Sequence, residues 1–113
     1  MSFEFSPPAA PAPPPLVFFD RPELDRLLGL YGRMVASGDW KDYAIDGGGE
    51  AATFSVFRRA GDAPLYRVEK RPALAQRQGA WSVQAQNGVV LRRGHELAQV
   101  LKVFDARRFR VVE

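Results

Sequence analysis

The spacing of apolar residues changes near Trp40, and the change limits the folds available to this chain. Between Leu24 and Val35 apolar side chains recur every three or four positions, which is the period of a helix. After Trp40 apolar and polar residues alternate in short segments separated by turns, which is the pattern of strands. Strands joined by short turns pair antiparallel. We therefore expect an α+β fold, an antiparallel meander sheet of five to six strands with two helices packed on one face.

The first helix is predicted over residues 21–37. Asp20 followed by Glu23 has the spacing of a capping box, Pro22 suits the first turn, and Gly38 favours an end. The apolar stripe expected to face the sheet consists of Leu24, Leu27, Leu28, Tyr31 and Val35. A flanking strip of small residues predicts close packing on the protein's own sheet or, alternatively, against a helix of a second chain; it consists of Gly29, Gly32 and Ala36.

The hairpin at Asn87-Gly88 decides which residues of its second strand face the core. A two-residue loop would pair Val83 with Arg92 and place that arginine among core residues. A three-residue loop pairs Val83 with Leu91 instead and keeps the apolar side chains on one face. Because the buried face determines register, we predict the longer loop, with Arg92 pointing outward.

The two ends of the chain differ from its middle. Residues 1–15 are rich in proline and alanine, and proline lacks the amide donor that helices and strands need, so we expect a disordered tail there. Residues 16–113 are expected to form a single α+β domain. Within it, helical spacing predicts a second helix over residues 95–105. A last strand is predicted over residues 107–112, with Phe109 and Val111 on one face.

Charge is divided unevenly along the chain. Residues 1–50 carry 4 basic and 8 acidic side chains, residues 51–113 carry 12 basic and 5 acidic ones, and the net charge is +3. Most of the C-terminal basic residues are arginines, whose planar guanidinium groups bind phosphates and carboxylates. Such a basic surface attracts anions, so the expected partner is a nucleic acid or an acidic protein surface.

Strand alternation sorts these arginines onto one side of the sheet. If the apolar residues point inward, their neighbours form an exposed basic face. On such a face arginines hold phosphates while an aromatic ring stacks on a base, as in proteins that bind single-stranded nucleic acid. The candidate anion-binding or nucleic-acid-binding residues are Phe57, Arg59, Arg67, Arg71 and Arg92. An ordinary solvated surface is the alternative interpretation of the same pattern.

No motif in the chain specifies a reaction. The chain has no Cys and one histidine, His95, which excludes thiolate nucleophiles and leaves a Ser-His-Asp triad without evident partners. The run Gly47–Gly49 lacks the Lys-Ser/Thr of a phosphate-binding loop and is expected to be a turn. We therefore expect no metal, no cofactor, no catalytic residue and no enzymatic activity. A pocket that contains Tyr66, Arg67 and Glu69 is the enzymatic alternative.

Several stretches of the sequence resemble a family of small bacterial proteins. They are residues 18–21 (FFDR), 54–60 (FSVFRRA), 63–72 (APLYRVEKRP) and 91–97 (LRRGHEL). The chain is similar, from residue 17 to residue 113, to domain-of-unknown-function family 2794, found chiefly in alphaproteobacteria. The resemblance implies a cytoplasmic bacterial protein, and it brings no activity and no catalytic residue.

Two functions are compatible with these observations. The first is a non-enzymatic binding module that holds RNA, DNA or another anionic partner on its arginine-rich face. The second is a regulatory or scaffold protein that acts through protein–protein contacts or self-association as a homo-oligomer, because oppositely charged halves pair head to tail. No run of about 18 apolar residues occurs, so no membrane partner is expected.

Overall fold

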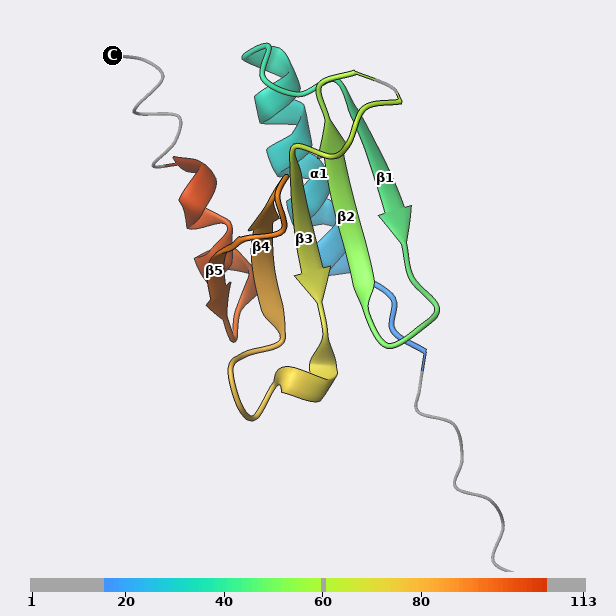
Figure 1. The fold of residues 1–113 in the computed structure, drawn as a ribbon, viewed down its shortest axis with the longest axis vertical. Coiled ribbons are helices and arrows are strands. Elements are labelled where there is room, and N and C mark those ends of the chain that lie inside the picture. The colour runs from blue at the N-terminus through green and yellow to red at the C-terminus, as the bar shows by residue number, and fades with distance from the viewer. Residues whose placement is uncertain (1–15, 60, 106–113) are drawn as a thin grey trace, which may run out of the picture.

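The computed structural model of this protein describes residues 16–59 and 61–105 (Figure 1). Its elements, in chain order, are α1 (Arg21–Ala36), β1 (Asp42–Asp46), β2 (Ala52–Phe57), β3 (Tyr66–Lys70), the 3-10 helix η1 (Pro72–Leu74), β4 (Trp81–Ala85), β5 (Val90–Gly94) and α2 (Leu97–Val100). After one turn residue, residues 102–105 are helical again. The tail predicted over residues 1–15 and the strand predicted over 107–112 lie outside the described residues.

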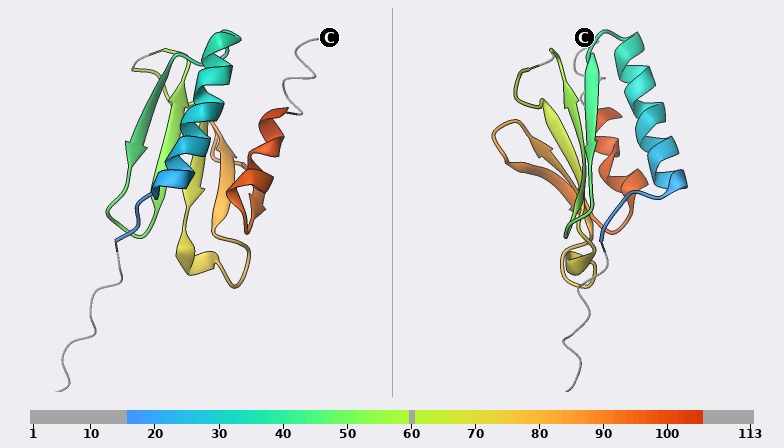
Figure 2. Two further views of the ribbon diagram at one scale, coloured as in Figure 1. Left: turned by 180° about the vertical axis from the view of Figure 1, so that it is seen from behind. Right: turned by 90° about the vertical axis from the view of Figure 1, so that its right-hand side faces the viewer.

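The five strands form one sheet in the order β1-β2-β3-β4-β5, and each neighbouring pair is antiparallel. Both helices lie on the same side of this sheet, as the edge-on view in Figure 2 shows. The predicted α+β architecture is therefore confirmed for the described residues. We call the side under the helices the helix face and the opposite side the open face, and in the described part of the chain no helix covers the open face.

α1 begins with the predicted capping box. The side chain of Asp20 accepts a hydrogen bond from the backbone N–H of Glu23 at 2.9 Å, and the Glu23 carboxylate accepts one from the backbone N–H of Asp20 at 2.8 Å. These two bonds satisfy amide donors that the first turn of a helix leaves free. The helix ends at Ala36, one residue earlier than predicted, and Gly38 follows with a φ of +84°.

The face that α1 buries agrees with the prediction only in part, because Leu24, Leu27 and Tyr31 pack against the core as expected and the other two members of the predicted stripe do not. Leu27, Leu30 and Met34 are buried against the sheet, whereas Leu28 and Val35 are 37% and 40% exposed. Both sets of residues have helical spacing, because α1 carries two adjacent apolar stripes. The sheet covers one stripe, and the other faces sideways toward β1. The sequence pattern of the helix does not show which of the two stripes the sheet will cover.

The strip of small residues on α1 also lies away from the sheet. Gly29, Gly32 and Ala36 are exposed. A Cβ atom added at Gly32 would meet nothing within 4 Å, and one at Gly29 would meet only the Arg33 guanidinium at 4.0 Å. The expected close packing of this strip on the protein's own sheet is therefore wrong.

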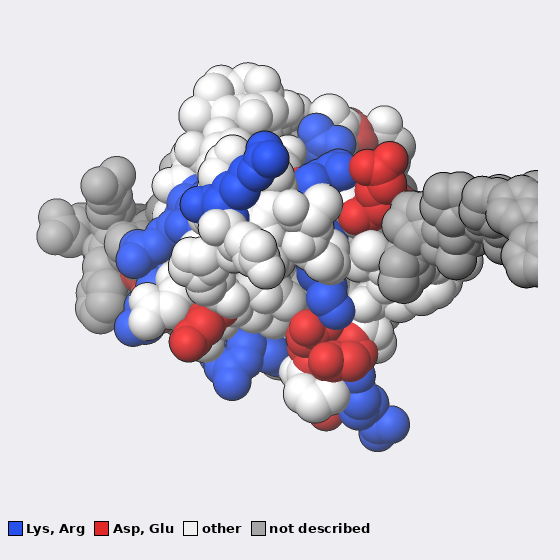
Figure 3. All heavy atoms as spheres, turned by 90° about the horizontal axis from the view of Figure 1, so that it is seen from below, with Lys and Arg blue, Asp and Glu red and all other residues white. Residues whose placement is uncertain are grey.

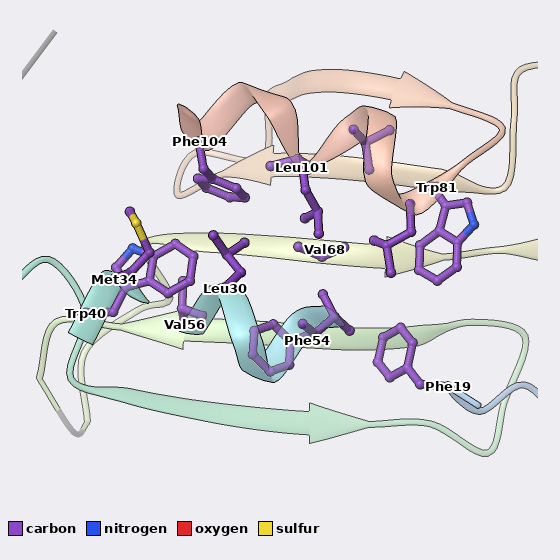
Figure 4. Packing of buried hydrophobic residues seen from close by; sticks show 14 of the residues in the cluster. Phe19, Leu30, Met34, Trp40, Phe54, Val56, Val68, Trp81, Leu101 and Phe104 are labelled. Carbon is purple, nitrogen blue, oxygen red and sulfur yellow. The ribbon is translucent and has the colours of Figure 1, made fainter. Parts of the chain in front are cut away.

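The hydrophobic core fills the space between the sheet and the two helices (Figure 4). Phe54, Val56 and Val68 project into it from β2 and β3, and each is at most 2% exposed. The ring of Phe104, also fully buried, meets the ring of Trp40 edge to face at 5.2 Å. This contact holds the C-terminal helical residues against the connection between α1 and β1.

The β4–β5 hairpin combines the two registers that the sequence offers. At the turn, the backbone N–H of Ala85 donates to the carbonyl of Val89 at 2.8 Å, so the predicted three-residue loop is confirmed. Leu91 is then an extra residue that forms a bulge, and beyond it Val83 pairs with Arg92. Leu91 still packs against the core. Arg92 consequently lies at the sheet edge on the helix face, and the prediction that it points outward with the open-face residues is wrong.

Candidate anion-binding face

The register of the strands arranges the side chains of the open face in two rows. The first row contains Asp46, Thr53, Glu69, Ser82 and Arg93. The second row contains Ala44, Ser55, Arg67, Gln84 and Val90. Alternation along each strand produces this arrangement, because the residues between them point into the core. The open face is therefore predominantly polar, with one arginine in each row.

Arg67 lies near the middle of the open face, on the central strand β3. Its cross-strand neighbours are Ser55 on β2 and Gln84 on β4, both uncharged. Its side chain is exposed, and no carboxylate among residues 16–59 and 61–105 forms an ion pair with it. This guanidinium group is therefore able to bind an external anion.

Arg93 lies at the β5 end of the other row, opposite Ser82. Its Nη1 atom is buried and has no hydrogen-bond partner in the part of the chain that the structure describes. Ser82 is itself fully buried, and its hydroxyl accepts a hydrogen bond from Gln84 Nε2 at 3.3 Å. A buried donor without an acceptor is uncommon in proteins. Arg93 as a whole is half-buried and forms no ion pair with a described residue, so it is a second cation able to attract an anionic ligand, although not through the buried Nη1 atom.

Arg71, by contrast, has its charge satisfied inside the molecule. Its Nε and Nη2 atoms each lie 3.3 Å from an oxygen of Glu69, and its Nη1 atom lies 3.7 Å from Glu50. The hydrogen bond to Glu69 and the negative charges of both carboxylates raise the pKa of Arg71 above its ordinary value. An anion at this position would have to compete with two carboxylates, so Arg71 is a poor candidate for binding phosphate.

The remaining candidate residues are spread over the molecule. Phe57 lies on the open face at the end of β2, opposite Asp42, and is half-buried. Arg59 is exposed in the connection between β2 and β3. Arg92 lies on the helix face. Of the five residues proposed from the sequence, the structure thus brings Phe57, Arg67 and Arg71 onto the open face.

Sequence reasoning missed Arg93, although the Arg92-Arg93 doublet contained the necessary signal. Adjacent residues of a strand point to opposite faces, so one of the two arginines had to lie on the open face. The bulge at Leu91 decides which one does so. Figure 3, which views the molecule from the end where η1 lies, shows basic and acidic side chains interleaved over the surface. Acidic side chains therefore interrupt the basic ones on part of this end, while on another part several basic side chains lie side by side (Figure 3).

The residues of the enzymatic alternative do not converge. Tyr66 lies on the helix face, where its ring meets that of Phe104 at 5.1 Å, whereas Arg67 and Glu69 project from the open face. His95 is exposed just before α2. Within residues 16–59 and 61–105, no group of three or more His, Asp or Glu side chains is placed to hold a metal ion.

A second surface, at the β1 edge, is apolar. We call it the lateral strip; it consists of Leu28, Tyr31, Val35, Tyr43 and Ile45. The first three come from the sideways stripe of α1 and the other two from the helix face of β1. The rings of Tyr31 and Tyr43 meet at 4.7 Å, which joins the two elements. The four members other than Tyr31 are 37–44% exposed, and clustered apolar exposure of this kind often marks a contact surface.

The fold and its surfaces define a small α+β protein with one antiparallel sheet, covered by helices on one side and polar on the other. A family model described as protein of unknown function (DUF2794) matches residues 17–101, and the chain belongs to this family. No curated protein and no solved structure matches the chain. Among the described residues, no helix combines the length and the apolar character that crossing a bilayer requires.

Proposed function

We propose that this protein is a non-enzymatic binding module that holds an anionic partner, RNA or DNA, on its open face. The observation that carries the proposal is the pair Arg67 and Arg93, two arginines on the open face without an ion pair to any described residue. They lie two strand spacings apart across the sheet and two residues apart along the strands, so their backbones are separated by about 12 Å. An extended polymer with repeated charges fits this separation better than a single small anion does.

The surroundings of the two arginines also suit a nucleic acid strand. Gln84, a neighbour of Arg67, offers hydrogen-bonding groups for phosphate or sugar, and the half-buried ring of Phe57 lies at the end of β2, where it could stack on a base. The acidic residues of the same face, Asp46 and Glu69, oppose a phosphate backbone. We therefore expect modest affinity that depends strongly on salt.

Salt-dependent binding of a labelled single-stranded oligonucleotide tests the proposal. Each phosphate contact contributes a slope of roughly −0.7 to the plot of log affinity against log salt concentration. Replacing both arginines, in Arg67→Gln with Arg93→Gln, should weaken binding and reduce the size of the slope by about 1.4. Arg77→Gln, which removes an exposed arginine from the loop before β4, is the matched control and should leave more of the affinity intact.

Three results would contradict the proposal. They are an absence of oligonucleotide binding, affinity that does not change with salt, and a double variant that binds as tightly as the wild type. If polyglutamate competes as well as the oligonucleotide, the partner is an acidic protein surface instead, and the nucleic-acid assignment fails.

The lateral strip favours a second candidate function, a regulatory or scaffold protein that acts through protein contacts. Replacing Tyr43 and Ile45 with serine removes exposed apolar surface while leaving Arg67 and Arg93 in place. In pull-downs from nuclease-treated lysate, the wild type and the Arg67→Gln, Arg93→Gln variant should both recover a partner protein. The Tyr43→Ser, Ile45→Ser variant should not recover it. Identical recovery by all three proteins would contradict this function.

A further inference from the structure

We propose that the exposed edge of β1 binds residues 107–112 of a second copy of this chain as an added strand. The inference rests on the second candidate function and names the partner. Two copies that exchange this segment reciprocally form a closed dimer.

The two edges of the sheet differ in how well they resist pairing with another chain. β1 pairs with β2 over five consecutive residues without a bulge, and all five are exposed. β5, at the other edge, carries the bulge at Leu91 and an arginine on each face. Bulges and long basic side chains protect sheet edges from pairing. β1 has neither, and in the described chain its outer side pairs with no strand.

The two faces of β1 have opposite chemical character. Tyr43 and Ile45 project from its helix face, where they continue the apolar surface of α1 as part of the lateral strip. Asp42 and Asp46 project from its open face. A strand that pairs well with this edge therefore has apolar side chains on one face and basic side chains on the other.

The C-terminal segment has this alternation. Phe109 and Val111 occupy alternate positions, and Arg108 and Arg110 occupy the positions between them. Because side chains alternate along a strand, any register that places the two apolar residues on the helix face of β1 places both arginines on its acidic open face. Apolar and charge complementarity are therefore obtained together.

A second copy of β1 is a poorer occupant of the same edge. Symmetric antiparallel pairing centred on Ala44 would place each Asp42 directly opposite an Asp46 of the other chain. Like charges opposite one another destabilise a strand pair. The basic segment replaces this repulsion with attraction.

The segment is too far from the β1 edge of its own chain. α2 packs against β4 and β5, and the described chain ends with the helical residues that follow it on this side of the sheet (Figure 1). Phe104, next to the end of the described chain, lies against Tyr66 of β3, so at least two strand spacings, about 10 Å, separate that end from β1, and α1 lies across the helix face between them. Residues 106 and 107 span at most about 7 Å. The segment therefore reaches the β1 edge of another copy rather than its own.

A charge-swap experiment on the full chain tests this arrangement. One variant carries a basic edge, Asp42→Lys with Asp46→Lys, and the other an acidic segment, Arg108→Glu with Arg110→Glu. By light scattering, the wild type should have about twice the monomer mass, and each variant alone should have the monomer mass, since its edge and segment repel. An equimolar mixture should recover the dimer, because each edge then meets a segment of opposite charge.

A monomeric wild type, variants that remain dimeric, or a mixture that stays monomeric would each overturn the inference. Circular dichroism of both variants shows whether they fold, and the substituted residues of β1 are exposed. The same proteins separate this inference from the functions proposed above. If the chain is monomeric throughout but the Tyr43→Ser, Ile45→Ser variant still loses a captured protein, the contact function stands and self-pairing fails. Oligonucleotide binding through Arg67 is measured independently of both.

Discussion

The Lys70 ammonium group lies 2.7 Å from a carboxylate oxygen of Glu23, although 47 residues separate the two in the chain. Lys70 also donates to the carbonyl of Phe18 at 2.9 Å and lies 5.8 Å from the centre of the Trp81 ring. The same carboxylate oxygen of Glu23 closes the capping box with Asp20. One lysine on the helix face of β3 thus links the sheet to the first turn of α1.

Lys70→Met should lower the free energy of unfolding by about 1–3 kcal/mol, because it removes charged hydrogen bonds from a site where both side chains are only 19% exposed. Asp25→Asn is the control, since the Arg21–Asp25 pair at 3.6 Å is 86% and 68% exposed. It should change stability by less than about 0.5 kcal/mol. Urea denaturation measures both, and equal losses would show that the Lys70–Glu23 contact is no stronger than a surface pair.

Gly79 should tolerate no side chain. Its φ is +102°, and an added Cβ atom would overlap the carbonyl group of Gly94. Gly88 has a similar φ of +87° with nothing within 4 Å, so Gly88→Ala reports backbone strain alone, about 1–2 kcal/mol. Gly79→Ala should cost roughly 1–3 kcal/mol more, because two backbone segments must separate. Thermal unfolding of the two variants checks this, and equal melting temperatures would contradict the close approach.

The change of hydrophobic period was sufficient to predict the fold, because each strand buries one face and each helix one stripe. The face that α1 buries was predictable only in part, since two apolar stripes lie side by side on it. Leu27 and Leu28 both fit an apolar stripe with helical spacing. Only the position of the sheet makes Leu27 buried and Leu28 exposed.

The candidate site depended on finer details than periodicity supplies. Because of the bulge at Leu91, Arg93 rather than Arg92 lies on the open face. The alternation of apolar and polar residues in the sequence does not reveal a one-residue bulge. The pairing of Arg71 with Glu50 joins residues from different strand connections. By contrast, the Arg71–Glu69 contact spans two residues of one face, and alternation alone could have predicted it.

The orientation of α1 predicts unequal effects for two neighbouring leucines. Leu27 is fully buried, so Leu27→Ala should cost about 2–5 kcal/mol. Leu28 is 37% exposed on the lateral strip, and Leu28→Ala should cost less than about 1.5 kcal/mol. Chemical denaturation at a protein concentration low enough to favour the monomer compares them. A larger loss for Leu28 would mean that α1 is rotated relative to the arrangement described above.

Alkaline pH should weaken the contact between α1 and β1 through Tyr31. Burial raises the pKa of Tyr31, and the negative charges of Asp42 and of ionised Tyr43 raise it further. The folded protein therefore holds this proton more tightly than the unfolded chain, whose tyrosines titrate near pH 10. The resulting stability is complete below about pH 10 and is lost as the pH rises through the folded-state pKa.

Ultraviolet titration of tyrosinate should accordingly show one group that ionises above the ordinary tyrosine range and that is missing in Tyr31→Phe. Asp42→Asn should lower the pKa of Tyr31 only in part, because burial is the larger cause. Urea denaturation across the alkaline range should show a steeper loss of stability in the wild type than in Tyr31→Phe, since only the wild type must release this proton on unfolding. Equal slopes for the two proteins would mean that folding does not raise the pKa of Tyr31.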